Sequence, residues 1–369
     1  MDSIPLVDIR LQTEEVAAEV REGFARVFEQ SSFIFGDDVA AFEKDFAAFC
    51  GVRHCVGVGN GTDAVELALR AAGVTAGDEV LVPANSFVAS AAAVVRTGAT
   101  PVLVDVDPAT LLFDADDAAS RVGPRTRAVM PVHLYGQMAP MEAVRELAAS
   151  AGASVVADAA QAHGASQAGA PMAKFGDASA TSFYPGKNLG AFGDGGAVLT
   201  DSDDLAGKLR SLRNHGSQVK YEHPTVGFNS RLDTLQAVVL TAKLRRLAMW
   251  NEARCRAAEL YGVLLDGVEE ATRPTSAPGN VHVWHLYVVQ VPHRDRVLAH
   301  MNAHGIGAGI HYLAPIHLHG AFRFLGYGPG DFPVSEAAAD RILSLPIYPG
   351  ISAAQQERVV GILVDALRG

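Results

Sequence analysis

The segment TSFYPGKNLGAFGDGGAVLT, residues 181–200, places one lysine, Lys187, between an apolar run and a loop rich in glycine. A lysine whose amine is drawn into a cleft can lose its proton and attack an aldehyde to form an imine. A phosphate-binding loop offers another role for a lysine, but that motif requires Ser or Thr directly after it, and Asn188 follows here. Lys187 is therefore a candidate nucleophile, with Ser182 on the apolar run before it.

The segment GVGNGTDA is a candidate anion site around Gly61 and Thr62. Its small residues let backbone amides approach a ligand, and the helix that follows presents its positive end, which suits a phosphate. A tight turn with an ordinary helix cap is the alternative. A dinucleotide fingerprint fails on spacing, because the glycines give G-x-G-x-G and no acid ends the next strand.

In the segment SVVADAAQAHG, Asp158 ends an apolar run. A carboxylate there is costly unless it has a partner, so it caps a helix, binds a metal or holds a protonated nitrogen. Metal binding is the weaker alternative, because Asp158, Gln161 and His163 form a mixed set with no second carboxylate close by. We expect no metal site.

Together these three segments suit one ligand that carries a phosphate, an aldehyde and a ring nitrogen. Pyridoxal 5'-phosphate has all three groups. Asp158 fits the role of holding the ring nitrogen protonated, which lets the ring accept electrons from a substrate carbanion, and Lys187 fits the Schiff-base role. Phe87, at the start of a helix, could stack on the ring, and its alternative role is that of a core aromatic.

The elements that must bring these segments together alternate along the chain from about residue 35 to 240. Short apolar runs such as HCVGVGNG and DEVLVPA are followed by helical patterns such as TDAVELALRAAG. This alternation predicts a mostly parallel sheet covered on both faces, and ligands in such sheets collect at the carboxyl ends of the strands. Thr62 or Asp63 is expected to cap the first of these helices, with Gly73 at its end.

The pattern changes near residue 232, where LDTLQAVVLTAKLRRLAMWNEARCRAAELYGVLL reads as one long helix. We therefore expect a large domain over residues 1–240, with an N-terminal arm. Residues 241–369 are expected to form the linking helix and a small α+β domain.

Composition limits the possible partners. The net charge of -11 and the pI near 5.6 argue against a nucleic-acid-binding protein. No apolar run is long enough to span a membrane, and the start MDSIPLVDIR lacks the features of a signal peptide, so we expect no membrane association and a cytoplasmic location. The three cysteines form neither a paired framework nor a zinc spacing.

Several segments, in this order, resemble the DegT/DnrJ/EryC1/StrS family of sugar aminotransferases over nearly the whole chain: GNGTDA, DAAQAHG, SFYPGKNLGAFGDGGA, NHG, GFNSRLDTLQAV and LSLPIYPG. The lysine segment is similar to that of members that aminate the 3-keto position of dTDP-linked deoxyhexoses. Other members aminate C4 of a nucleotide sugar, or act on cyclitols or an aminobenzoate precursor. Members that dehydrate a sugar carry histidine at the lysine position, where this chain has Lys187.

The resemblance implies the type I, aspartate aminotransferase-like fold and a homodimer in which the partner completes each active site. It implies that Lys187 binds pyridoxal phosphate covalently, that Asp158 contacts the ring nitrogen and that Gln161 lies near the ring. The phosphate would be held by Gly61, Thr62 and Ser182, with Asn229 reaching it from the other subunit. Asn229 has an alternative role as a helix cap.

The substrates expected from the resemblance are an amino acid donor, L-glutamate, and a nucleotide-linked keto sugar. A diphosphate needs cations and hydrogen-bond donors in so acidic a protein. The candidates are Tyr184, Lys220, Tyr221, Arg231, His311 and Tyr312. Lys220 and Arg231 could instead be solvated surface charges. A nicotinamide-dependent oxidoreductase is the alternative outside the family, but it needs the missing dinucleotide fingerprint.

Overall fold

A seven-stranded sheet forms the centre of the computed structural model, which describes residues 3–219 and 221–369. The strand order is β1-β9-β8-β5-β4-β2-β3. The strands are β1 (His54–Val58), β2 (Glu79–Pro83), β3 (Thr100–Val104), β4 (Thr126–Val129), β5 (Ser154–Asp158), β8 (Ala178–Ser182) and β9 (Gly196–Thr200). All neighbours pair in parallel except β9, which runs antiparallel to both β8 and β1. The predicted mostly parallel sheet is thereby confirmed.

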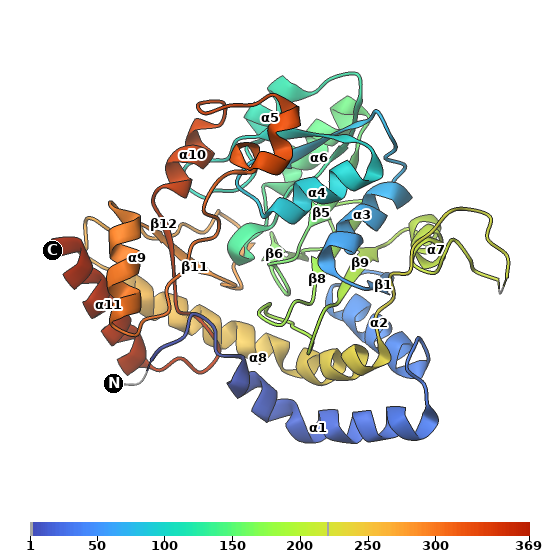
Figure 1. Ribbon diagram of the computed structural model, residues 1–369, viewed down its shortest axis with the longest axis horizontal. Coiled ribbons are helices and arrows are strands. Elements are labelled where there is room, and N and C mark those ends of the chain that lie inside the picture. Colours follow the sequence, from blue (N-terminus) through green and yellow to red (C-terminus); the bar gives the residue numbers. More distant parts are fainter. Residues whose placement is uncertain (1–2, 220) are drawn as a thin grey trace.

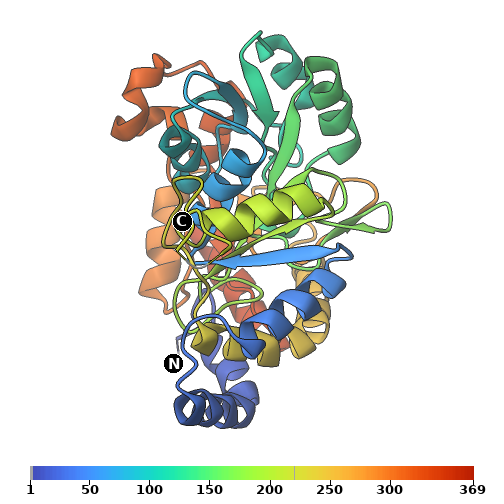
Figure 2. The same ribbon diagram turned by 90° about the vertical axis from the view of Figure 1, so that its right-hand side faces the viewer.

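Helices cover both faces of this sheet, because alternate strand residues face opposite sides (Figure 1). In β1, Cys55 packs into one buried cluster and Val56 into the other. The first cluster holds residues of α2 (Asp37–Phe49), α5 (Ala115–Arg121), α6 (Met141–Ala151) and α8 (Thr234–Leu264); the second holds α3 (Gly61–Ala71), α4 (Val88–Thr97) and α7 (Asp203–Leu212). Figure 2 shows α7 and the pair α2 and α8 on opposite sides of β1. Burial on both faces explains why these strands read as continuous apolar runs.

The expected cap of α3 was wrong. The helix begins two or three residues earlier than an N-cap at Thr62 or Asp63 would place it, with Asn60 as its N-cap. The Asn60 side chain accepts a hydrogen bond of 2.8 Å from the backbone N–H of Asp63. Asparagine is as good an N-cap as aspartate, and the local sequence NGTDA offers several candidates. Gly73, with a φ of +87°, follows the last helical turn as expected.

The C-terminal part packs around the second half of α8. Two antiparallel strands, β11 (Tyr287–Gln290) and β12 (Ile342–Leu345), share a buried cluster with Tyr261 of α8. The other elements there are β10 (Asn280–Val281), α9 (Arg294–Ala303), the 3-10 turns η2 (Ile316–Leu318) and η3 (Gly320–Leu325), α10 (Pro333–Ala339) and α11 (Ala353–Arg368). The long helix was predicted correctly, while the domain boundary at residue 240 stays a prediction.

The N-terminal segment contacts both the C-terminal part and the long helix α8. Ile4 pairs with Ile306 and packs in the C-terminal cluster, and α1 (Ile9–Gln30) then lies along α8 (Figure 1). Trp250 of α8 donates a hydrogen bond of 3.0 Å to Glu15 of α1. Short elements complete the fold: η1 (Leu134–Gly136), β6 (Ser166–Gln167) and β7 (Ala170–Pro171). None of the helices described in residues 3–219 and 221–369 combines the length and apolarity needed to cross a bilayer.

Candidate active site

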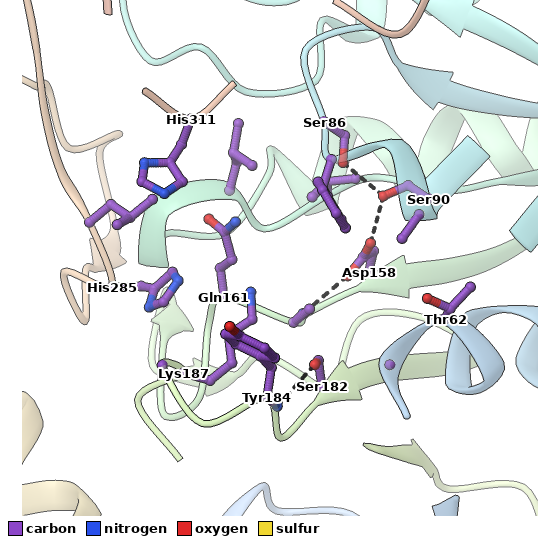
Figure 3. A pocket seen from close by; sticks show the side chains of 18 of the residues that line it. Thr62, Ser86, Ser90, Asp158, Gln161, Ser182, Tyr184, Lys187, His285 and His311 are labelled. Carbon is purple, nitrogen blue, oxygen red and sulfur yellow. Dashed lines mark hydrogen bonds between the residues drawn. The ribbon is translucent and has the colours of Figure 1, made fainter. Parts of the chain in front are cut away.

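A cavity of about 610 Å³ lies where several strands of the sheet end (Figure 3). Asp158 is the last residue of β5 and Ser182 the last of β8, so parallel pairing places them at one edge of the sheet. Ten residues that the sequence analysis singled out line this cavity: Gly61, Thr62, Phe87, Asp158, Gln161, Ser182, Tyr184, Lys187, His311 and Tyr312.

One corner of the cavity is formed by the N-terminus of α3. A Cβ on Gly61 would lie 2.5 Å from the Cβ of Ser182, so only glycine lets the first turn of the helix approach this strand end. The backbone N–H groups of a first helical turn have no partner within the helix, and the helix dipole is positive there. The helix start and the Ser182 hydroxyl therefore form a cradle suited to a phosphate.

Asp158 forms the floor of the cavity and is 7% exposed. Its Oδ2 accepts a hydrogen bond of 2.7 Å from the Ser90 hydroxyl, and its Oδ1 accepts one of 3.1 Å from the backbone N–H of Ala160. The Ser86 and Ser90 hydroxyls are themselves 2.7 Å apart. An ionised carboxylate has about four lone-pair sites, so two bonds leave Asp158 able to accept from a ligand. Ser86 and Ser90 were missed by sequence reasoning, although Ser86 lies in the loop after β2 and Ser90 in the first turn of α4.

Lys187 points into the same cavity from the turn that follows β8 (Figure 3). Its backbone N–H donates to Tyr184 O at 2.9 Å, which closes this turn. Burial of the amine lowers the pKa of Lys187 from 10.5 to about 8, and the negative charge of Asp158 opposes this shift. About a tenth of the amine is therefore neutral at pH 7, far more than for an exposed lysine, and the neutral form is the one that a nucleophile requires.

Three histidines surround this lysine, and each is held neutral. Burial lowers the pKa of His163 to about 3 and that of His311 to about 4, and the charge of Lys187 acts in the same direction. Burial also lowers the pKa of His285 well below its usual value, again with a contribution from Lys187. His285 lines the cavity and was missed by the sequence analysis, where its segment was assigned only to the small α+β domain.

A chain of hydrogen bonds joins the C-terminal part to the large sheet beside the cavity. Gln161 accepts from the Tyr135 backbone N–H at 2.6 Å and donates to the Tyr312 hydroxyl at 3.0 Å. The Tyr135 hydroxyl donates to the backbone carbonyl of His311 at 2.6 Å. The rings of Phe87 and Tyr312 lie 5.1 Å apart, so Phe87 is a cavity-wall aromatic that is 50% exposed, and it is not part of the core.

Three predicted residues lie outside the cavity of their own chain. Asn229 is exposed and pairs with Asn214 in an isolated bridge, and Arg231 donates to the Asn214 side chain at 2.9 Å. Tyr221 is 83% exposed, on a loop that projects beside α7 (Figure 1). Lys220 lies outside the described residues. Of the residues that the structure describes, Lys187 is the only lysine or arginine that lines the cavity.

Comparison of the sequence with known protein families identifies a family whose cofactor fits these cavity residues. The family model described as the DegT/DnrJ/EryC1/StrS aminotransferase family matches residues 14–364. The chain belongs to this family. Its members depend on pyridoxal phosphate, and the cradle at Gly61, the open lone pairs of Asp158 and the amine of Lys187 fit that cofactor.

Family members of known activity resemble the chain over almost its full length. The dTDP-3-amino-3,4,6-trideoxy-alpha-D-glucose transaminase of Streptomyces venezuelae is 44% identical over 365 residues, which cover 99% of this chain and 95% of that protein. The UDP-N-acetyl-3-dehydro-alpha-D-glucosamine 3-aminotransferase of Acidithiobacillus ferrooxidans is 42% identical over 100% of this chain and 99% of its own.

A solved family structure confirms the fold. The crystal structure of S. venezuelae DesV in complex with a ketimine intermediate matches with a TM-score of 0.98 and 43% identity, covering 100% of both chains. The chain therefore has the expected type I α/β fold of pyridoxal-phosphate-dependent transferases and is an aminotransferase of this family.

Proposed function

We propose that this aminotransferase transfers the amino group of L-glutamate to C3 of a dTDP-linked 3-keto-6-deoxyhexose. The observation that carries the proposal is the full-length similarity to the S. venezuelae transaminase, combined with a cavity in which Lys187 and Asp158 lie together. A second relative, from Aneurinibacillus thermoaerophilus, is named a dTDP-3-amino-3,6-dideoxy-alpha-D-galactopyranose transaminase and is 42% identical over 97% of this chain. The names of both relatives support C3.

Within this proposal the cofactor, when bound, supplies a ring that accepts the electron pair left on the substrate carbon. Gly61, Thr62 and Ser182 hold its phosphate, and Asp158 keeps the ring nitrogen protonated. Phe87 covers the face of the ring, and the Gln161 side chain lies near it.

Lys187 carries two roles in the proposal. Its amine is the covalent attachment point, and its Nζ then moves a proton to or from the reacting carbon. The lowered pKa of Lys187, about 8, suits both roles, because the amine exchanges a proton readily near neutral pH.

The substrate enters past Tyr184, His311 and Tyr312, which line the cavity beyond Lys187. A nucleotide diphosphate and the carboxylates of glutamate both carry negative charge, yet Lys187 is the only lysine or arginine among the described lining residues. We therefore propose a homodimer in which the partner supplies Asn229, Arg231, Tyr221 and Lys220. These groups bring the missing cations and hydrogen-bond donors to the cavity mouth.

The proposal places the enzyme in the cytoplasm. Cys50, Cys55 and Cys255 carry free thiols, which suits a reducing compartment.

The test begins with the purified protein and added pyridoxal phosphate. A visible absorption band should appear, and borohydride reduction should fix it to the peptide that contains Lys187. The protein is then incubated with L-glutamate and with dTDP-linked 3-keto or 4-keto deoxyhexoses, and NMR identifies the carbon that gains nitrogen. Nitrogen at C4 would refute the proposed position, and a protein that never gains the band would refute the cofactor assignment.

A further inference from the structure

The turn that carries Lys187 packs against a glycine that follows it in the chain. The Lys187 backbone N–H donates to Tyr184 O at 2.9 Å, which closes the turn. A Cβ on Gly190 would clash with the carbonyl oxygens of Pro185 and Tyr184, so only glycine lets the backbone pack this closely on the turn. We call residues 183–192 the lysine loop. Whatever holds Gly190 therefore also holds the turn that presents Lys187 to the cavity (Figure 3).

Gly190 is held by Lys243, a buried lysine on α8. The Nζ of Lys243 donates to Gly190 O at 2.7 Å and lies 4.8 Å from the centroid of the Phe192 ring. Lys243 is 3% exposed and does not line the cavity. Burial lowers the pKa of Lys243 from 10.5 to about 8, and no carboxylate in the described part of the chain counteracts this shift. A buried cation without a carboxylate partner is costly in free energy, which is unusual for a residue that only fills space.

Two further side chains of α8 hold the same loop. Gln236 Oε1 accepts from the Phe192 backbone N–H at 2.8 Å, and Asn251 Oδ1 accepts from Asn188 Nδ2 at 2.9 Å. Together with Lys243 they are spaced seven and eight residues apart along α8, so the three side chains lie on one face of the helix. The three contacts all fall on the half of the lysine loop that follows Lys187. We call these three side chains the α8 clamp.

We propose that the α8 clamp positions the Lys187 amine for attachment to the cofactor, with the bond from Lys243 to Gly190 O as its central contact. The inference rests on the role of Lys187 in the proposed function. Lys243 does not reach the cavity, so it is a positioning residue that acts through the lysine loop. Both its amine and its ammonium form carry N–H donors, so the bond persists whether or not Lys243 is protonated.

The attachment step is sensitive to position. Nζ of Lys187 forms a double bond to the aldehyde carbon, and the aldehyde oxygen leaves as water with the two protons of the neutral amine. A shift of about 1 Å in a reacting group can slow such a step about a hundredfold. A loosened lysine loop should therefore slow attachment, while the phosphate cradle at Gly61 stays intact because α3 lies outside the α8 clamp.

The first test uses the full chain without cofactor. Hydrogen exchange with mass spectrometry compares the lysine-loop peptide of the wild type with that of Lys243→Met, whose side chain has a similar length but no donor. Loss of the bond should raise exchange of the loop amides roughly tenfold or more, whereas peptides from α3 should keep their rates. Unchanged exchange in the lysine loop would overturn the proposal.

The second test separates the position of Lys187 from cofactor binding. Pyridoxamine 5'-phosphate has the phosphate and the ring but no aldehyde, so its affinity does not depend on attachment. For Lys243→Met we expect this affinity to stay within about twofold of the wild type. The rate of attachment of pyridoxal 5'-phosphate, followed by stopped-flow absorbance at saturating cofactor, should fall roughly tenfold or more. A wild-type rate, or an equal loss of affinity and rate, would overturn the proposal.

Val239→Ala is the matched control on the same helix. Val239 is fully buried but packs with residues of α1, away from the lysine loop. It should therefore weaken the packing of α8 and leave loop exchange and the attachment rate at wild-type values. Equal effects of Val239→Ala and Lys243→Met would overturn the proposal, because general loosening of α8 would then explain both.

Gln236→Leu gives a second test of the α8 clamp in case Lys243→Met does not fold. Gln236 is only half-buried, and its loss removes the acceptor for the Phe192 N–H, so loop exchange should rise and attachment should slow. Wild-type values of both in this variant would overturn the clamp. A protein that binds neither pyridoxal nor pyridoxamine phosphate would refute the proposed function, and the exchange measurement would still decide whether the α8 clamp holds the lysine loop.

Discussion

The hydroxyl of Ser90 donates a hydrogen bond of 2.7 Å to Oδ2 of Asp158, and both side chains are buried. Because an ionised carboxylate can only accept, Ser90 must be the donor here, and the Ser86 hydroxyl, 2.7 Å away, then donates to Ser90. This directed pair of hydroxyls fixes the orientation of the carboxylate at the carboxyl end of β5.

Replacing Ser90 with alanine should therefore weaken the action of Asp158 on the cofactor. Loss of a hydrogen bond to a buried charge costs about 1.5–3 kcal/mol, so we expect kcat to fall roughly tenfold or more. The ultraviolet-visible spectrum and ¹⁵N NMR of the bound cofactor report whether its ring nitrogen stays protonated. Ser86→Ala is the control and should have a smaller effect, because Ser86 reaches Asp158 only through Ser90. An equal loss in both variants would contradict this order.

Substitution of Gly61 tests the phosphate cradle. In Gly61→Ala the new Cβ would lie 2.5 Å from Ser182 Cβ and 3.1 Å from its Cα, so the start of α3 must move away from β8. We expect weaker retention of pyridoxal phosphate, measured by fluorescence titration of the cofactor-free protein. Gly262→Ala is a suitable control, since a Cβ there meets no atom within 4 Å in the helix α8. Equal cofactor affinity in both variants would argue against the cradle.

Lys187 should make the stability of the cofactor-free protein depend on pH in the alkaline range. Its pKa is about 8 in the folded protein and 10.5 in the reference state, so between these values the unfolded chain binds more protons. The free energy of unfolding therefore rises with pH across this window. Lys187→Met removes this dependence. The free energy of unfolding of Lys187→Met minus that of the wild type should therefore be roughly 2–4 kcal/mol larger at pH 7 than at pH 10.5. Urea unfolding at both pH values measures the change.

A buried histidine outside the cavity should destabilise the protein in mild acid. His133 is fully buried, and burial lowers its pKa from 6.5 to about 4. As pH falls below 6.5 the unfolded chain takes up a proton that the native state does not bind, so the free energy of unfolding falls until about pH 4. His133→Asn keeps an acceptor near the backbone N–H of Ala139, which bonds His133 Nδ1 at 3.3 Å, but cannot take up the proton.

Between pH 7 and pH 5 the wild type should lose about 2 kcal/mol more stability than His133→Asn. Guanidinium unfolding curves of both proteins at the two pH values give this difference. Parallel losses in both would show that His133 is protonated in the native state as well.

The sequence predicted those parts of the site that local patterns control. Asp158 and Ser182 end apolar strands and Lys187 follows one, so the rule that ligands gather at strand ends was enough to group them. His285 could not be found in this way, because a segment far along the chain brings it to the cavity and a hydrogen bond to Asn188 orients it. The cap of α3 was misassigned because neighbouring Asn, Thr and Asp residues have similar capping preferences.

The proposed homodimer, in which the partner supplies part of each active site, can be tested with mixed dimers. Asn229 and Arg231 do not line the cavity of their own chain, whereas Lys187 does. If the partner supplies the first two, then mixing Lys187→Ala with the double variant Asn229→Ala/Arg231→Ala should restore activity. Random reassembly makes half of the dimers mixed, and each mixed dimer has one intact site of two, so about a quarter of the wild-type rate is expected.

The matched control mixes Lys187→Ala with Asp158→Ala. Both residues line the cavity of one chain, so a mixed dimer retains no complete site and activity should stay at the level of the separate variants. Both mixtures are unfolded and refolded together so that the subunits exchange, and size-exclusion chromatography confirms the dimers. No recovery in the first mixture would show that each active site is built from a single chain, and the cations for the diphosphate would then have to come from elsewhere in that chain. Recovery in the control mixture would contradict the placement of Lys187 and Asp158 in the cavity of one chain.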